Sequence, residues 1–169
     1  MVIKNRNGWT LVELMIVAAI TGILASITPT IITQTTKFFI LSKTKLELQE
    51  QARAIMYILT RELRQAQSNS ITIDGALNQP YYSRIVFTKI GGTQIMKFAQ
   101  SGTNLILTTI SNNHTDNNTL TKNLVYLAFT FPKSDDMTIV SVSLTLQEQI
   151  YNGQLKAMHM ASEKVRVMN

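Results

Sequence analysis

The chain has 169 residues, a formal charge of +6 and no cysteine. This length allows one globular domain plus a shorter appendage, and the lack of cysteine excludes a disulfide framework and any cysteine-based metal or redox site. Two basic residues, Lys4 and Arg6, precede Gly8, so removal of the first eight residues lowers the formal charge from +6 to +4. The other basic residues are scattered among acidic ones, which indicates a solvated surface rather than a stripe that binds nucleic acid.

The first predicted element is an apolar helix. No ionisable side chain occurs from Leu14 to Ile32, and about 19 residues at about 1.5 Å each roughly span the hydrocarbon core of a bilayer. Pro29 removes one backbone donor and should kink or loosen this helix. A single carboxylate, Glu13, stands at its front, although an unpaired charge in an apolar medium costs on the order of several kcal/mol.

An amphipathic helix follows over residues 37–67, which contain neither glycine nor proline. Its apolar residues recur at steps of three, four or seven and therefore share one helical face; they are Leu41, Leu48, Ala52, Ile55, Leu59, Leu63 and Ala66. The opposite side carries Lys45, Gln49, Arg53 and Arg61. Because no linker separates the two patterns, we expect one continuous helix whose first half needs lipid or other helices and whose second half covers a core.

Residues typical of strands alternate with turn signals after Ser68. The pattern predicts strands over 84–90, 93–99, 105–110, 124–131 and 138–146, with a last one within 154–168, and a polar loop over 112–118. The short connections predict one antiparallel sheet of about five to seven strands. With the long helix packed on it, this sheet gives an α+β fold.

The sequence contains no recognisable catalytic motif. The patterns GxSxG, Walker A, HExxH and the EF-hand loop are absent, and His114 and His159 are expected to be structural or exposed to solvent. Asp116, Asp135 and Asp136 are expected in loops, where a weak calcium site stays open although the DxDxD spacing is missing; no other cofactor is expected. His114 with Asp116 also leaves open an enzyme hypothesis, a hydrolase tethered to a membrane.

Two common kinds of N-terminal segment fit poorly. A signal peptide needs a small-x-small cleavage site after its apolar region, and no convincing site of this kind follows the apolar run. A plain single-pass anchor accounts for the apolar run but leaves Glu13 unexplained.

The stretch GWTLVELMIV, from Gly8 to Val17 after the basic residues Lys4 and Arg6, closely resembles the type III signal of prepilins and pseudopilins. In that family a short basic leader ends in glycine, the next residue is usually phenylalanine, and a glutamate follows five positions into the mature chain. Trp9 stands here in place of the phenylalanine. The resemblance implies cleavage between Gly8 and Trp9 by a membrane aspartic prepilin peptidase, followed by N-methylation of the new amino terminus on Trp9.

The resemblance also implies a partner for Glu13. Cleavage creates an ammonium group at Trp9, about one helical turn away, and pairing recovers much of the cost of two ions in an apolar medium. In a filament of stacked helices, the carboxylate of one subunit is expected to meet the terminal amine of its neighbour. The chain then divides into a leader over residues 1–8, a transmembrane and filament-core helix over 9–36, and an extracytoplasmic pilin-like globular domain over 37–169.

Two further stretches resemble one branch of this family. ARAIMYILTRELRQAQ, from Ala52 to Gln67, and the ending ASEKVRVMN are similar to segments of J-type minor pseudopilins and related minor pilins. No cysteine pair of the kind that closes the terminal loop of many major pilins is present, which favours a minor component. The resemblance implies a structural protein, not an enzyme, of a type II secretion pseudopilus or type IV pilus. It would lie in the bacterial inner membrane with its C-terminal domain in the periplasm.

The implied partners are the prepilin peptidase, the inner-membrane assembly platform, and other pilins or pseudopilins that contact the N-terminal helix. Lys4 and Arg6 on the cytoplasmic side obey the positive-inside bias. An alternative from the binding class is a competence-type minor pilin whose basic loops bind DNA at a filament tip, and such binding would weaken steeply with salt.

Overall fold

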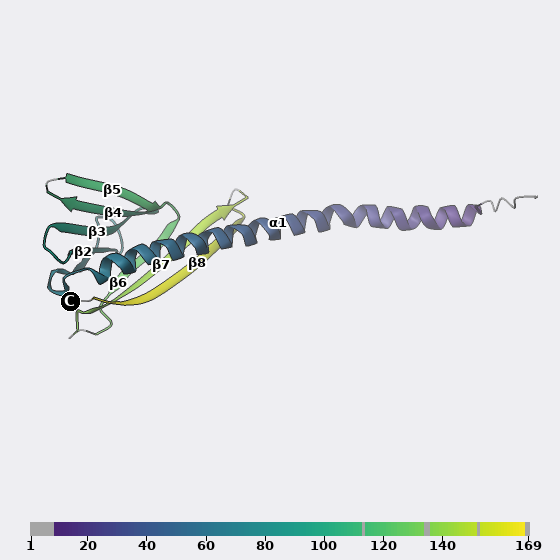
Figure 1. Cartoon of the computed structure of the whole chain (residues 1–169). Coiled ribbons are helices and arrows are strands. Elements are labelled where there is room, and N and C mark those ends of the chain that lie inside the picture. The colour runs from purple at the N-terminus through teal and green to yellow at the C-terminus, as the bar shows by residue number, and fades with distance from the viewer. Residues whose placement is uncertain (1–8, 113, 134–135, 152, 168–169) are drawn as a thin grey trace, which may run out of the picture. The chain divides into compact units, whose positions relative to one another are not determined.

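The computed structural model describes residues 9–112, 114–133, 136–151 and 153–167. The elements in chain order, labelled in Figure 1, are α1 (Leu11–Arg64), η1 (Ser68–Ser70), β1 (Thr72–Asp74), β2 (Arg84–Thr88), β3 (Gln94–Ser101), β4 (Asn104–Ser111), β5 (His114–Thr121), β6 (Leu124–Thr130), β7 (Ile139–Ile150) and β8 (Leu155–Arg166). The chain divides into two compact units, one up to Ile40 and one from Leu41 onward.

The first unit is the N-terminal part of α1, and every residue from Trp9 to Phe39 is exposed. The predicted disturbance at Pro29 does not break the helix, which continues to Arg64. Hydroxyl groups in this part donate to the carbonyls of the preceding turn, with Thr21 Oγ1 2.6 Å from the Val17 oxygen and similar bonds from Ser26, Thr28, Thr33 and Thr36. These five hydroxyl groups therefore find acceptors within the helix and suit surroundings without water.

In the second unit, α1 presents the predicted apolar face to a core. Leu48, Ala52, Leu59 and Leu63 are fully buried, Ile55 is nearly so, and Leu41 packs partly buried against the same cluster. Ala66 is also fully buried but lies two residues beyond the end of α1, which stops short of the predicted residue 67. On the opposite side Lys45, Arg53 and Arg61 are exposed and Gln49 is half-buried. The spacing of apolar residues thus identified the packed face correctly.

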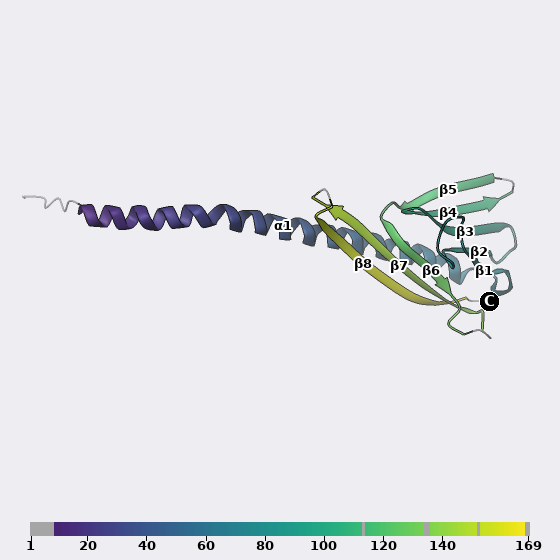
Figure 2. The same cartoon turned by 180° about the vertical axis from the view of Figure 1, so that it is seen from behind.

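Within the described ranges the strands form two antiparallel sheets, a five-stranded one in the order β1-β2-β3-β4-β5 and a three-stranded one in the order β6-β7-β8 (Figure 2). The prediction of a single sheet is therefore wrong. Alternating apolar residues indicate which face of a strand is buried, but they carry no information on which strand lies beside it. The chain leaves β5 at Thr121 and begins the second sheet at Leu124.

Most predicted strands are found within a few residues of their expected bounds, but two regions differ. The short edge strand β1 was not predicted, and β5 covers most of the predicted polar loop, with Asn112 at a φ of 47° in the turn before it. β5 pairs with β4 from Ser111↔His114 to Leu105↔Thr121. Its composition disfavours strands, yet an edge strand with exposed side chains tolerates polar residues and is even protected by them from unwanted pairing.

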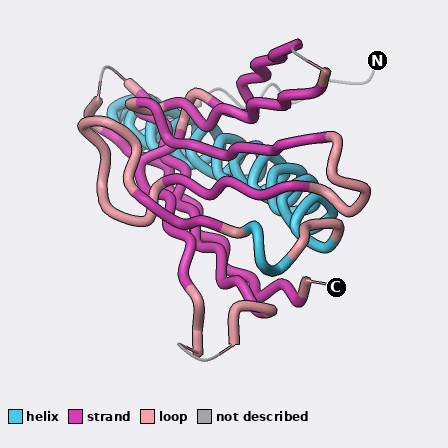
Figure 3. Tube along the Cα trace, turned by 90° about the vertical axis from the view of Figure 1, so that its left-hand side faces the viewer, coloured by secondary structure: helices cyan, strands magenta, loops and turns pink. Residues whose placement is uncertain are grey.

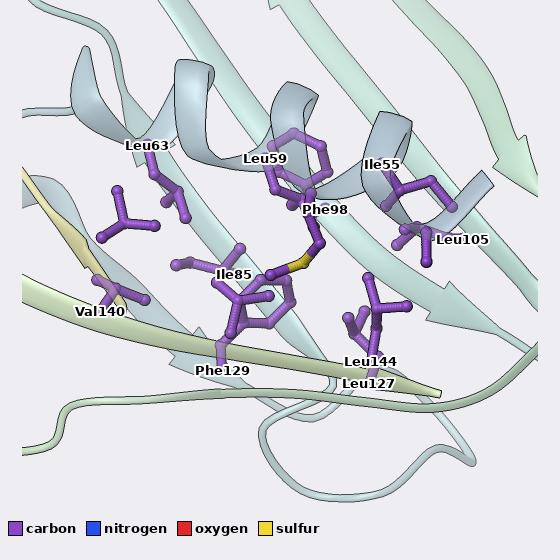
Figure 4. Close-up of a cluster of buried hydrophobic side chains, with 14 of the residues drawn as sticks. Ile55, Leu59, Leu63, Ile85, Phe98, Leu105, Leu127, Phe129, Val140 and Leu144 are labelled. Carbon is purple, nitrogen blue, oxygen red and sulfur yellow. The ribbon is translucent and has the colours of Figure 1, made fainter. Parts of the chain in front are cut away.

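The core of the second unit lies between α1 and the two sheets (Figure 3). Figure 4 shows side chains from α1, such as Leu59, meeting side chains of the first sheet, such as Phe98, and of the second, such as Phe129. The rings of Phe87 and Phe98 stack with centroids 6.3 Å apart. One cluster thus joins the helix to both sheets.

An ion-pair cluster ties the C-terminal end of α1 to the β2–β3 connection. Glu62 Oε1 lies 2.7 Å from Arg61 Nη2 and its Oε2 lies 2.5 Å from Lys89 Nζ, while the Glu62 side chain is only 6% exposed. Burial alone would raise the pKa of the Glu62 carboxyl, but the hydrogen bonds and charges of Lys89 and Arg61 outweigh it and hold this pKa below its ordinary value. The mixture of acidic and basic residues along the sequence predicts a solvated surface, and the burial of Glu62 departs from that prediction.

Candidate functional site

The N-terminal end of α1 is closed by a capping box. Thr10 precedes the first helical residue, Leu11, and its backbone N–H donates to Glu13 Oε2 at 2.8 Å. The Thr10 hydroxyl donates to the same oxygen at 3.0 Å and accepts from the Glu13 N–H at 3.2 Å. These bonds satisfy backbone donors that the first helical turn leaves without intrahelical partners.

The capping box sits next to the expected cleavage position. Trp9 directly precedes Thr10 and is 76% exposed, so an amine created on Trp9 would lie at the same helix end as the Glu13 carboxylate. Lys4, Arg6 and Gly8 lie outside the described residues. Glu13 thus lies in the first helical turn, four residues after Trp9, the residue expected to become the amino terminus.

The surroundings of Glu13 are apolar over several helical turns. By length and composition α1 is able to cross a membrane, and large apolar side chains are exposed around the helix; they include Leu11, Val12, Leu14, Met15, Ile16, Val17, Ile20, Ile23 and Leu24. Exposed apolar surface of this extent marks contact with lipid or with other protein. The exposed apolar helix is consistent with contact with a membrane or with the helices of other chains.

The other predicted site residues do not form a reaction centre. His114 Nε2 and Asp116 Oδ1 do meet, at 2.9 Å, but both side chains are more than 70% exposed on the edge strand β5. Asp116 therefore lies in a strand rather than in the expected loop, and Asp136, which accepts from Thr138, precedes a strand of the other sheet. Asp135 lies outside the described residues, and His159 is half-buried in β8.

No three histidine, cysteine or acidic side chains gather into a metal-binding group within the part of the chain that the structure describes. The weak calcium site that the sequence left open gains no support from the described aspartates, because Asp116 lies in β5 of one sheet and Asp136 precedes β7 of the other.

Sequence reasoning missed the role of Thr10. The pattern T-x-x-E before an apolar run, formed by Thr10 and Glu13, is a known signature of a helix start. Both residues stand in the printed sequence, so this local signal was sufficient to predict the cap.

The fold and the N-terminal end of α1 together indicate the class of protein. A long apolar N-terminal helix whose second half packs against antiparallel sheets is a pilin-like α+β fold. Residues 3–28 match the family model described as the prokaryotic N-terminal methylation motif, whereas no curated protein matches the chain. The chain therefore carries, at the start of a pilin-like fold, the prepilin-type N-terminal motif at which pilins and pseudopilins are processed.

Pilins are structural proteins rather than enzymes, so the hydrolase hypothesis built on His114 and Asp116 is set aside. The motif also implies processing by a prepilin peptidase and assembly with other pilins. It covers only the N-terminal segment and does not distinguish major from minor subunits, or one filament system from another.

Proposed function

We propose that this chain is a minor pseudopilin or minor pilin that joins a type II secretion pseudopilus or a type IV pilus. The observation that carries the proposal is the start of α1, where a single carboxylate in a capping box opens an apolar segment that has no globular partner of its own. The resemblance of the stretch from Ala52 to Gln67 to minor subunits supports the finer assignment.

Processing is the first step of the proposed function. The peptidase cuts between Gly8 and Trp9 and leaves a mature chain that begins at Trp9 and is N-methylated there. The exposed position of Trp9, one residue before the capping box, supports this step. The leader over residues 1–8 then carries away Lys4 and Arg6 on the cytoplasmic side.

Assembly is the second step. The helix over residues 9–36 first anchors the subunit in the inner membrane, with residues 37–169 on the periplasmic side, and then packs among the helices of neighbouring subunits with the help of the assembly platform. Thr10 supplies two hydrogen-bond donors to Glu13 but no positive charge. The terminal amine of a neighbouring subunit would supply that charge, since a buried carboxylate needs a counter-ion.

The intact mass of the mature protein tests processing. We expect a chain that begins at Trp9 and carries one extra methyl group when it is isolated from cells with an active prepilin peptidase. Cells that lack the peptidase provide the control and should retain the leader. If Met1 is retained in the presence of the active peptidase, the proposed processing is wrong.

A further inference from the structure

A groove of about 630 Å³ lies beside the second half of α1. Its helix side is lined by Arg53, Tyr57, Arg61 and Arg64, and its strand side by Glu163 of β8. We call this feature the arginine groove. All five residues belong to the second compact unit, so the groove is complete within that unit.

The helix side of the groove is a regular stripe. The four helical residues follow one another at steps of four, four and three and therefore lie on one helical face, over about 16 Å from first to last at the usual rise. The strand side is open because β8 is the edge of the three-stranded sheet (Figure 2). Glu163 pairs in register with the buried Val142 and thus faces the helix side of the sheet, yet it stays exposed at this edge.

Of the three arginines in the groove, Arg53 and Arg64 form no ion pair with a described residue. Arg61 is held by Glu62, and its guanidinium carbon lies 6.0 Å from the centre of the Tyr57 ring. Arg53 and Arg64 have no acidic partner within 4.0 Å among residues that the structure describes. Their guanidinium groups are exposed along a concave surface and available to a partner.

The chemistry of the groove favours one kind of partner. Guanidinium groups bind carboxylates in a bidentate geometry, and Tyr57, which is 66% exposed, adds an amphipathic contact surface of the kind enriched at protein interfaces. A nucleic acid places a negative charge at every phosphate, and Glu163 in the wall would repel one of them. A protein segment with widely spaced carboxylates carries fewer negative charges along its length, so Glu163 repels it less.

We propose that the arginine groove binds an acidic segment of a partner protein, with carboxylates on Arg53 and Arg64 and an apolar or aromatic side chain against Tyr57. This binding depends only on the second unit. Binding to the groove can therefore be tested independently of the cleavage and methylation of the N-terminus.

The test uses the full chain, with its leader, in a nanodisc of zwitterionic lipid. The probe is a short fluorescent peptide in which glutamates are interspersed with serines and one tyrosine, and its counterpart carries glutamine in place of glutamate. We expect the glutamate peptide to bind at least about tenfold more tightly, and the Arg53→Glu/Arg64→Glu variant to lose about tenfold or more of this affinity, because it replaces attraction by repulsion.

Three further variants sharpen the result. Arg53→Lys/Arg64→Lys keeps the charge but not the bidentate geometry and should lose only part of the affinity. Glu163→Gln removes the repulsive wall and should bind about twofold more tightly, whereas Lys156→Glu, an exposed charge reversal on β8 outside the groove, should change binding by less than about twofold. Circular dichroism should show the same fold for every variant, since these side chains are exposed.

Several outcomes would overturn the inference. These are no binding of the glutamate peptide, equal binding of the glutamine peptide, and unchanged binding by the double charge reversal. Tighter binding of a double-stranded DNA oligonucleotide than of the glutamate peptide, lost in the double reversal, would replace the proposal by the nucleic-acid alternative. Empty nanodiscs control for adsorption of the probe.

Discussion

The two halves of α1 place the same kinds of side chain in opposite environments. From Leu11 to Phe39 every side chain is exposed, including isoleucines and leucines on all sides of the helix, whereas from Leu48 to Leu63 one face is buried against two sheets. A continuous helical backbone therefore does not imply one continuous environment. The distribution of apolar residues around the helix, rather than their number, decides what each half requires.

The apolar side chains of the second half pack against the sheets of the same chain. Those of the first half require contact with lipid or with other subunits. A substitution in the second half should therefore change the stability of the globular unit. A substitution in the first half should leave that stability unchanged and act only in the membrane or the filament. The same substitution made in both halves separates these effects.

The largest effect on stability is expected from Leu59→Ala. Leu59 is fully buried between α1 and the sheets, and removal of such a side chain lowers the free energy of unfolding by about 2–5 kcal/mol through lost burial and a residual cavity. Denaturant unfolding of the full chain in nanodiscs, followed by the circular dichroism of its sheets, measures this change.

The matched control is Leu24→Ala, which removes the same atoms from an exposed position in the first half. It should leave the free energy of unfolding of the globular unit unchanged. Equal losses in both variants would show that the two halves form one cooperative unit and would contradict the comparison.

A smaller effect is expected from Lys89→Met, which leaves the buried Glu62 carboxylate with Arg61 as its remaining ion-pair partner. Loss of a partner from a buried charged group costs about 1–3 kcal/mol at neutral pH. Lys122→Met removes an exposed lysine and should cost far less. Comparable losses in the two variants would show that the Glu62 cluster adds no particular stability.

The same ion pairs predict a direction for the pH dependence. The pKa of Glu62 is lower in the folded chain than its ordinary value of 4.5, so its contribution is fully present above that value and is lost as the pH falls through the lowered folded pKa. In Lys89→Met this acid-dependent loss should be smaller than in the unchanged chain. Unfolding measured across the acid range tests this, and an identical acid dependence would contradict the role of Lys89.

The sequence predicted features that depend on local spacing and missed those that depend on distant pairing. The buried face of α1 follows from the spacing of Leu48, Ala52 and their successors. The cap formed by Thr10 and Glu13 is equally local and could have been predicted, although it was not. By contrast, the composition of β5 favours a loop, and only pairing with β4 makes it a strand. Tertiary contacts thus override local propensity at this sheet edge.

For charged residues too, the sequence shows local spacing but not the contacts between distant parts of the chain. The helical spacing of Arg53, Arg61 and Arg64 is visible in the sequence, but the wall formed by Glu163 appears only when β8 lies beside the helix. Glu62 follows Arg61 in a charged stretch and was expected to be solvated. Its burial depends on Lys89, which lies 27 positions further along the chain and reaches it through the β2–β3 connection.

The smallest effect on stability, with the largest on assembly, is expected at Glu13. Glu13→Val removes the charge and the two bonds that the carboxylate accepts from Thr10 but keeps the bond from its own N–H to the Thr10 hydroxyl. The cost at the helix end should therefore stay below the about 0.5–2 kcal/mol of losing the N-cap residue itself. The stability of the globular unit should stay the same, because Glu13 lies in the first half. Incorporation into filaments and methylation of Trp9 should fall, as measured by filament isolation and by intact mass.

Glu13→Gln separates the two roles of this side chain. Glutamine retains an oxygen that accepts from Thr10 and so preserves the capping box, but it cannot pair with the terminal amine of a neighbour. If the charge decides assembly, Glu13→Gln should fail as Glu13→Val does, whereas Thr10→Val, which keeps the carboxylate, should still assemble. Normal assembly of Glu13→Gln would mean that Glu13 acts only within its own helix, and normal assembly of Glu13→Val would remove the pairing proposal altogether.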